Sequence, residues 1–201
     1  MKNQKERGLV KIQKVTKLIL IAALTSPAFA SAKKLEVDPN HSTIAFEATH
    51  LKISKILGRF TDFSGTVDLD EKDITKSKVD FVVNIPSLTT AVSKRDDHLR
   101  TADFFDAQKY SKSTFQNALI KKSGAGYTLT GDLTIRDVTK KVSFQVKNLG
   151  KVEDSMMKAE KYVFSATGKI NRKDFGVNYG SDAIVGDNVD LWINLETMPA
   201  A

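Results

Sequence analysis

The stretch from Tyr127 to Ile135, which reads YTLTGDLTI, decides the fold class of this chain. Tyr127, Leu129, Leu133 and Ile135 stand on one face of the stretch, and threonines and Asp132 stand on the other. A period of two is that of a β-strand with one apolar and one polar face. Since an apolar face must be buried, the stretch predicts an antiparallel sheet that is wetted on one side.

Seven further stretches repeat this alternation, which gives about eight strands. They are Ser42–His50, Gly58–Asp70, Val79–Ile85, Thr114–Leu119, Lys141–Lys147, Tyr162–Ile170 and Val189–Glu196. In the fourth of them we expect Phe115 and Leu119 on the inward face. The sequence lacks long amphipathic helices that could cover a flat sheet, so the sheet must close on itself or fold into a sandwich. We predict an all-β fold, an antiparallel eight-stranded barrel, with a sandwich as the alternative.

One segment departs from the alternation. Ser93 is of a residue type whose side chain commonly caps the first turn of a helix, and acidic residues follow it. Leu99, Phe104 and Phe105 supply an apolar side. We predict one or two short helices between about 94 and 109, lying across an end of the barrel as a plug or lid.

The first thirty residues have the composition of an export signal. Six basic residues accompany the short apolar run Leu18–Leu24, and Ala28 and Ala30 stand where a signal peptidase reads small side chains. The run is far below the roughly 20 residues that span a bilayer. We expect residues 1–30 to be a secretory signal peptide that is removed, with cleavage after Ala32 as the second choice. Residues 31–201 are then a single domain that is periplasmic, or alternatively secreted, and not an integral membrane protein.

Charge and cysteine content exclude several classes of function. The chain has 31 basic and 24 acidic residues, a net charge of +7. The predicted leader holds six of the basic residues and one acidic residue, which leaves 25 against 23. No nucleic-acid footprint remains, so we expect no nucleic-acid partner. The absence of cysteine excludes disulfide frameworks, thiol nucleophiles and cysteine-based zinc sites.

The histidines are the remaining candidates for chemistry. His41 lies in the turn Asp38–His41, and His50 lies on an apolar strand face, either as a hydrogen-bonded interior group or as the polar anchor of a ligand. No two histidines have the spacing of zinc ligands on a helix, so a zinc site is disfavoured and we expect no metal. The stretch Arg95–His98 is more typical of a capped helix with local ion pairs than of a catalytic centre. We predict no enzyme; the alternative is a hydrolase of unknown substrate that uses His50 or His98.

Aromatic residues dominate the predicted inward faces, and the strands contain isolated glycines. The inward phenylalanines include Phe46, Phe81, Phe115, Phe144 and Phe164. Gly131 and Gly168 indicate bends or close approach within strands. An eight-stranded barrel has an interior that is either packed or holds one small ligand. The pattern alone leaves both interpretations open, and a packed structural or adaptor barrel is the alternative to a hollow one.

Several motifs, taken in order, resemble the YceI-like family over about residues 35–197. They are Asp38–Phe46 with His50, Gly58–Val67, Ser87–Thr90, Arg95–Arg100, Asp103–Asp106, Gly131–Ile135 with Val138–Lys140, and Asn171–Gly176. The family consists of exported bacterial proteins with a lipocalin-like barrel. The resemblance implies an apolar tunnel that holds a long lipid chain, such as a polyisoprenoid, an isoprenoid quinone or a fatty amide, for transport or storage. It also implies a possible homodimer, and no cofactor other than the bound lipid.

Two connections depart from the family pattern. Tyr110-Ser111 stands where the family has Tyr-Pro, and Arg136-Asp137 stands where it has His-Gly. Because both changes lie at the rim of the predicted barrel, the family's head-group preference is not carried over to this chain. Outward Val82 and Trp192 would suit a dimer surface. Transient membrane contact is a further expectation for a lipid carrier.

The ligand-binding residues that we expect combine the inward strand faces with the residues of the family motifs. They are Phe46, His50, Phe60, Val67, Phe81, Val83, Arg95, His98, Phe104, Phe115, Leu133, Phe144, Phe164 and Phe175. Most would line the tunnel, and His50, Arg95 and His98 would lie at its rim as polar anchors. No catalytic residue is predicted.

Overall fold

The computed structural model describes residues 32–156 and 158–200. The predicted leader, residues 1–30, lies outside them. The strands are β1 (Lys33–Val37), β2 (Thr43–His50), β3 (Ser54–Phe60), β4 (Phe63–Leu69), β5 (Lys78–Asn84), β6 (Leu88–Thr89), β7 (Lys112–Ser123), β8 (Gly126–Ile135), β9 (Val138–Asp154), β10 (Ala159–Asn171) and β11 (Val185–Pro199). One α-helix, α1 (Ser93–Arg100), and three short 3-10 helices, η1 (Ile74–Lys76), η2 (Ile85–Ser87) and η3 (Arg172–Phe175), complete the described elements.

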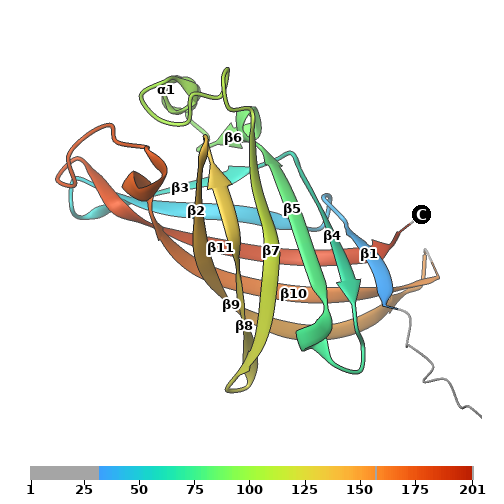
Figure 1. Cartoon of the computed structure of the whole chain (residues 1–201). Helices are drawn as coiled ribbons and strands as arrows, with labels where there is room; N and C mark the ends of the chain where they lie inside the picture. The colour runs from blue at the N-terminus through green and yellow to red at the C-terminus, as the bar shows by residue number, and fades with distance from the viewer. Residues whose placement is uncertain (1–31, 157, 201) are drawn as a thin grey trace, which may run out of the picture.

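The strands form one closed antiparallel barrel (Figure 1). Both β1 and β2 pair with β11, β1 at Thr197–Pro199 and β2 at Val185–Asn194, so together they fill one place in the wall. In the same way β3 pairs with β2 while β4 pairs with β1. Counting each of these two bent strands once, and leaving out the two-residue β6, the wall has eight strands. The predicted eight-stranded antiparallel barrel is therefore confirmed.

The inward faces follow the predicted alternation except on β7. Phe115 is buried as expected, but Leu119 is 65% exposed. The pairing of β7 with β8 shifts between Gln116 and Leu119, where Asn117 has a left-handed φ of 54°. A bulge of this kind inverts the faces beyond it. The prediction for Leu119 was wrong for that reason, and Ile120 faces inward in its place.

The segment that follows β6 lies at one end of the barrel (Figure 1). It forms one helix, α1, and the remainder up to residue 109 consists mainly of turns, so the second helix is absent. Val92, and not Ser93, is the N-cap residue. The buried carboxylate of Asp96 accepts hydrogen bonds from the hydroxyl groups of Thr89 and Thr90 and from the backbone N–H of Thr90. This contact ties α1 to β6.

Candidate functional site

Two cavities lie inside the barrel. The larger, of about 210 Å³, occupies the half that α1 and η3 border, and the smaller, of about 70 Å³, occupies the half near η1 and the β7–β8 hairpin. Four residues line both of them: Phe81, Leu129, Ala166 and Leu195. The cavities therefore lie in series along the barrel, separated by this ring of four side chains.

Eleven of the predicted ligand-binding residues line these cavities. Phe46, Phe60, Phe81, Val83, Phe104, Phe115, Leu133, Phe144 and Phe175 line the larger one, and Val67, Phe81 and Phe164 line the smaller one. The structure brings them together from eight strands and from the segments around α1 and η3. Ligand contact by these residues stays a prediction, but their common position on one apolar interior is a property of the fold.

Glycines on neighbouring strands explain why the inward phenylalanines do not fill the lumen. A Cβ atom on Gly58 would lie 2.2 Å from the ring of Phe46, and one on Gly65 would lie 2.6 Å from the ring of Phe81. Gly131 and Gly168 stand in the same relation to Phe115 and Phe144, which confirms the close approach expected at these two glycines. Each ring thus lies against the wall, over a neighbour that lacks a side chain.

Sequence reasoning did not assign this role to Gly58 and Gly65. The signal that could have found it is a glycine at an inward position of a strand. The cross-strand partner follows only from the register, in which Gly58 pairs with Phe46 and Gly65 with Phe81.

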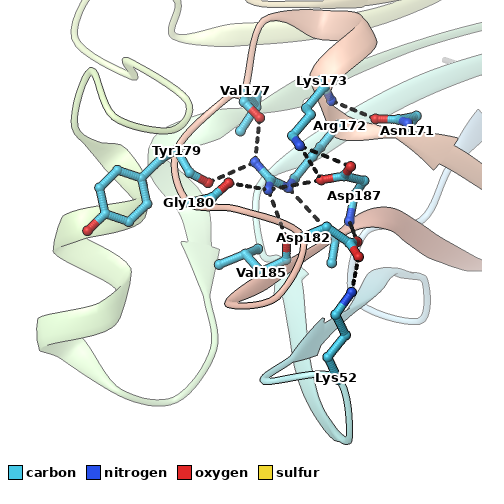
Figure 2. A network of polar contacts seen from close by, with 11 residues as sticks. Lys52, Asn171, Arg172, Lys173, Val177, Tyr179, Gly180, Asp182, Val185 and Asp187 are labelled. Carbon is cyan, nitrogen blue, oxygen red and sulfur yellow. Dashed lines mark hydrogen bonds and ion pairs between the residues drawn. The ribbon is translucent and has the colours of Figure 1, made fainter.

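The lining of the larger cavity is apolar apart from two residues, Ser113 and Arg172. The hydroxyl of Ser113 donates to the carbonyl oxygen of Thr134 at 2.6 Å. The guanidinium of Arg172 is buried and donates to the carbonyl oxygens of Val177, Tyr179, Gly180, Val185 and Gly186, and to the carboxylate of Asp187 (Figure 2). Because both polar groups are bonded to the protein, the lining offers them to no ligand. Arg172 instead holds the β10–β11 loop, residues 176–184, against the barrel.

The three predicted polar anchors lie outside the lining of both cavities. His50 ends β2 and is half-buried. Arg95 is engaged by Thr90, because its Nε donates to the Thr90 hydroxyl at 2.7 Å and its Nη2 to the Thr90 carbonyl at 2.9 Å. His98 lies 2.8 Å from a carboxylate oxygen of Asp103. Arg95 therefore has a structural role at the base of α1.

Helix α1 and the turns that follow it cover the larger cavity. We call residues 93–110 the lid; Leu99, Phe104 and Phe105 of the lid line the cavity. Arg136, in the β8–β9 turn, donates from Nη1 to the carbonyl oxygens of Gly176 at 2.8 Å and Phe104 at 3.4 Å.

The next residue of that turn adds a second link. The hydroxyl of Tyr110 donates to Asp137 at 3.0 Å. Arg136 and Asp137, which stand where the family has His-Gly, thus fasten the lid to the rim.

A buried ion network lies at the other end of the barrel. The Lys161 ammonium group is 3.0 Å from Asp38, 3.3 Å from Asp154 and 3.6 Å from Glu196. Burial raises the pKa of Asp38, but hydrogen bonds from His41 and Lys161 outweigh it and lower this pKa to about 2.

The same network contains the one group of possible metal ligands among residues 32–156 and 158–200, namely Asp38, His41 and Glu196. The ammonium group of Lys161 already supplies a cation to both carboxylates. His50 is about 30 Å of extended chain from His41, so these two histidines do not converge. The network is therefore structural.

No helix in the described ranges is long and apolar enough to cross a membrane. The predicted dimer surface does not form as expected. Val82 on β5 is half-buried, and β4 and β1 separate β5 from β11, the strand of Trp192. The two residues therefore do not make one patch.

The fold and the cavities define the class of this protein as a hollow antiparallel β-barrel with an apolar interior. The YceI-like domain model matches residues 35–197, and the chain belongs to the YceI-like family. The resemblance read from the sequence is thereby confirmed over the extent expected for it.

Known relatives agree with this assignment. The protein YceI of Escherichia coli is 37% identical over 169 residues, which cover 84% of this chain and 87% of that protein. The crystal structure of a Campylobacter jejuni YCEI protein is 33% identical with a TM-score of 0.66, covering 76% of this chain and 90% of that one.

A polyisoprenoid binding domain from Saccharophagus degradans, implicated in plant cell wall breakdown, has a structure that matches with a TM-score of 0.57 at 14% identity. The match covers 83% of this chain and 98% of that one, and the likeness shows the shared fold.

Proposed function

We propose that this protein holds one long apolar lipid chain inside its barrel, for transport or storage. The observation that carries the proposal is the lining of the larger cavity, in which Ser113 and Arg172 are the two polar residues and both are bonded internally. A site built to bind an apolar chain needs such a lining, because an unpaired polar group there would lose its hydrogen bonds to water on binding.

The arrangement of the cavities favours an extended ligand. Two cavities in series, joined at Phe81, Leu129, Ala166 and Leu195, suit a chain that threads along the barrel better than a compact ligand. A polyisoprenoid, an isoprenoid quinone or a fatty amide has this shape. The Saccharophagus degradans domain, which shares the fold and is a polyisoprenoid binding domain, supports the first of these classes.

Energetics suit a carrier. Each methylene group gains about 0.8 kcal/mol on leaving water, so a long chain is held firmly against an aqueous reference. A lipid that leaves a membrane is already out of water, and its tail gains little on transfer into the barrel. Near balance between barrel and membrane allows both loading and release. Selectivity then depends on cavity length and on the groups at the mouth.

Export is part of the proposal. The basic segment, the apolar run Leu18–Leu24 and the alanines at 28 and 30 support a signal peptide and a periplasmic location, with secretion as the alternative. Fractionation of the producing cells, with the mass of the purified chain, tests this. We expect the periplasmic fraction to contain a chain whose mass corresponds to a first residue at Ser31 or Lys33. A full-length chain in the cytoplasmic fraction would contradict export.

Binding is the proposed role, without catalysis. The lining of the larger cavity presents no free nucleophile or general base among the described residues, because Ser113 donates to Thr134 and Arg172 is saturated. His50 and His98 lie outside the lining. The family and the fold are of the binding kind.

Charged substitutions in the lining test the proposal. Phe81→Asp places a carboxylate among the four side chains that line both cavities, and Phe164→Asp places one in the smaller cavity. In both positions the charge loses its solvation by water. Each variant, with Leu119→Asp on the outer surface as control, is incubated with vesicles that carry a radiolabelled polyisoprenol, and lipid per chain is counted. Uptake near one lipid per chain is expected for wild type and Leu119→Asp, and near none for the lining variants. Equal uptake by a folded Phe81→Asp protein would contradict an internal site.

A further inference from the structure

Large apolar side chains stand exposed at the end of the barrel that the lid covers. Ile53 is 86% exposed, Leu51 is 55% exposed and Ile184 is 48% exposed. Leu51 and Ile53 belong to the β2–β3 turn, and Ile184 belongs to the β10–β11 loop. These two connections lie side by side (Figure 1). We call the three residues the apolar tip.

The apolar tip is held as one surface. The backbone N–H of Leu51 donates to the carbonyl oxygen of Ile184 at 3.0 Å. The ammonium group of Lys52 pairs with the carboxylate of Asp182 (Figure 2). The loop side is fixed in turn by Arg172. Three apolar side chains from two segments are therefore presented together.

The turn is built from residues that its backbone disfavours. Leu51 and Lys52 have φ values of 50° and 67°, and the N–H of Ile53 donates to the carbonyl oxygen of His50. A β-turn whose two central residues both have positive φ favours Asn-Gly at those positions. A bulky leucine there is uncommon, and its side chain packs into no core. The fold alone gives no reason for an exposed leucine at this position. Contact of this leucine with a surface outside the protein would give one.

The tip is continuous with the cavity. Val185, next to Ile184, lines the larger cavity. Tyr179 of the same loop contacts Phe104, a lid residue of the lining, with ring centroids 5.0 Å apart. Apolar surface therefore runs from the tip to the lining. A lipid that moves between a membrane and the cavity can pass along this surface.

The charges beside the tip are already neutralised. Lys52 is paired with Asp182, and Lys55 is paired with Glu47 at 2.9 Å. Because Lys52 and Lys55 carry their own counterions, neither leaves an unpaired positive charge beside the tip for an acidic partner. Paired charges beside exposed apolar side chains complement the zwitterionic head groups and hydrocarbon boundary of a bilayer.

We propose that the apolar tip inserts into the surface of a zwitterionic lipid bilayer and docks the mouth of the barrel on it. The contact is hydrophobic, so its strength changes little with salt. The proposal adds a docking surface to the lipid-binding function, and the two can fail separately. Vesicle binding tests the tip, while lipid retained after removal of vesicles tests the cavity.

The absence of cysteine allows a direct test. Ile53→Cys and Leu149→Cys, the latter 58% exposed on β9 at the other end, are labelled with an environment-sensitive fluorophore. With phosphatidylcholine vesicles we expect a blue shift and brighter emission from the Ile53 position alone. Equal responses at both positions, or none at either, would overturn the proposal.

Flotation measures the affinity. Ile53→Ser with Ile184→Ser is expected to reduce binding to phosphatidylcholine vesicles by about tenfold or more, because two exposed apolar side chains are lost. Leu119→Ser with Leu149→Ser is the matched control and should bind like wild type. Binding that needs anionic lipid and vanishes at high salt would overturn the hydrophobic contact. A fall in oligomeric mass in the double variant at the tip would assign the tip to a second copy instead.

Discussion

At the scale of single residues, glycine and phenylalanine together determine how hollow the barrel is. The ring of Phe81 lies over Gly65, where a Cβ atom would come within 2.6 Å of it. The three nearest atoms to that Cβ position all belong to the ring, so a methyl group there displaces the ring first. Since Phe81 has the largest side chain of the four residues that line both cavities, we expect its ring to limit the passage between them.

Gly65→Ala should therefore turn the ring of Phe81 into the lumen. We expect a cost in stability of about 1–3 kcal/mol from overpacking, and uptake of long lipids reduced more than that of short ones. Urea unfolding and a chain-length series of labelled lipids measure the two effects. The double variant Gly65→Ala with Phe81→Leu should recover uptake. Unchanged uptake of long lipids by Gly65→Ala would show that Phe81 does not limit the passage.

Asp38 is a second residue with a measurable consequence. Its ordinary pKa of 3.8 falls to about 2 in the fold. A carboxyl group with a depressed folded pKa stabilises the protein above its unfolded pKa, and this contribution is lost as the pH falls through the folded value. We expect Asp38 to contribute about 2 kcal/mol to the free energy of unfolding above about pH 5, lost by about pH 2.

Denaturant unfolding over that pH range measures the effect, and Asp38→Asn separates it from the other carboxylates. The variant should be less stable than wild type near neutral pH, and the difference should shrink as the solution is acidified. A constant difference between the two proteins across the range would contradict the assignment.

At the scale of elements, the lid depends on the β8–β9 turn. Arg136 has a φ of 57° and fastens the lid through the carbonyl oxygen of Phe104 and the β10–β11 loop through that of Gly176. The turn therefore joins the two connections that border the mouth of the larger cavity.

Arg136→Gly suits this backbone and removes both hydrogen bonds. We expect the free energy of local opening at residues 101–110 to fall by about 1–2 kcal/mol, with hydrogen exchange there and lipid release each about tenfold faster. Lys158→Gly is the matched control, because Lys158 also has a left-handed φ, of 51°, in an exposed distant turn. Equal exchange rates in the two variants would mean that Arg136 does not hold the lid.

Alternation predicted the strands and most of their inward faces, because the period of two is a local property. The inward set on β8 and β11 is the predicted one. The prediction from alternation failed on β7. There Leu119 and Ile120 are consecutive apolar residues, and a bulge decides which of the two faces inward. The polar anchors were predicted from residue type, and residue type does not specify the contacts that fix their positions, such as that of Arg95 with Thr90.

At the scale of the whole molecule, two features separate this barrel from a packed one. Its cavities lie in series and share an apolar ring, and its two ends differ. One end carries the lid, the Arg172 loop and the apolar tip, while the other holds η1 and the buried apolar cluster of Leu35, Val67, Leu69 and Tyr162. We therefore expect lipid to enter and leave at the lid end.

Native mass spectrometry tests the central claim most directly. The protein, expressed as the full chain and purified gently from the producing cells, is weighed intact and again after solvent extraction. The account predicts an excess mass that matches one long-chain lipid per protein chain and disappears on extraction. A mass equal to that of the bare chain, with no uptake of offered polyisoprenoids, quinones or fatty amides, would contradict a lipid-holding barrel.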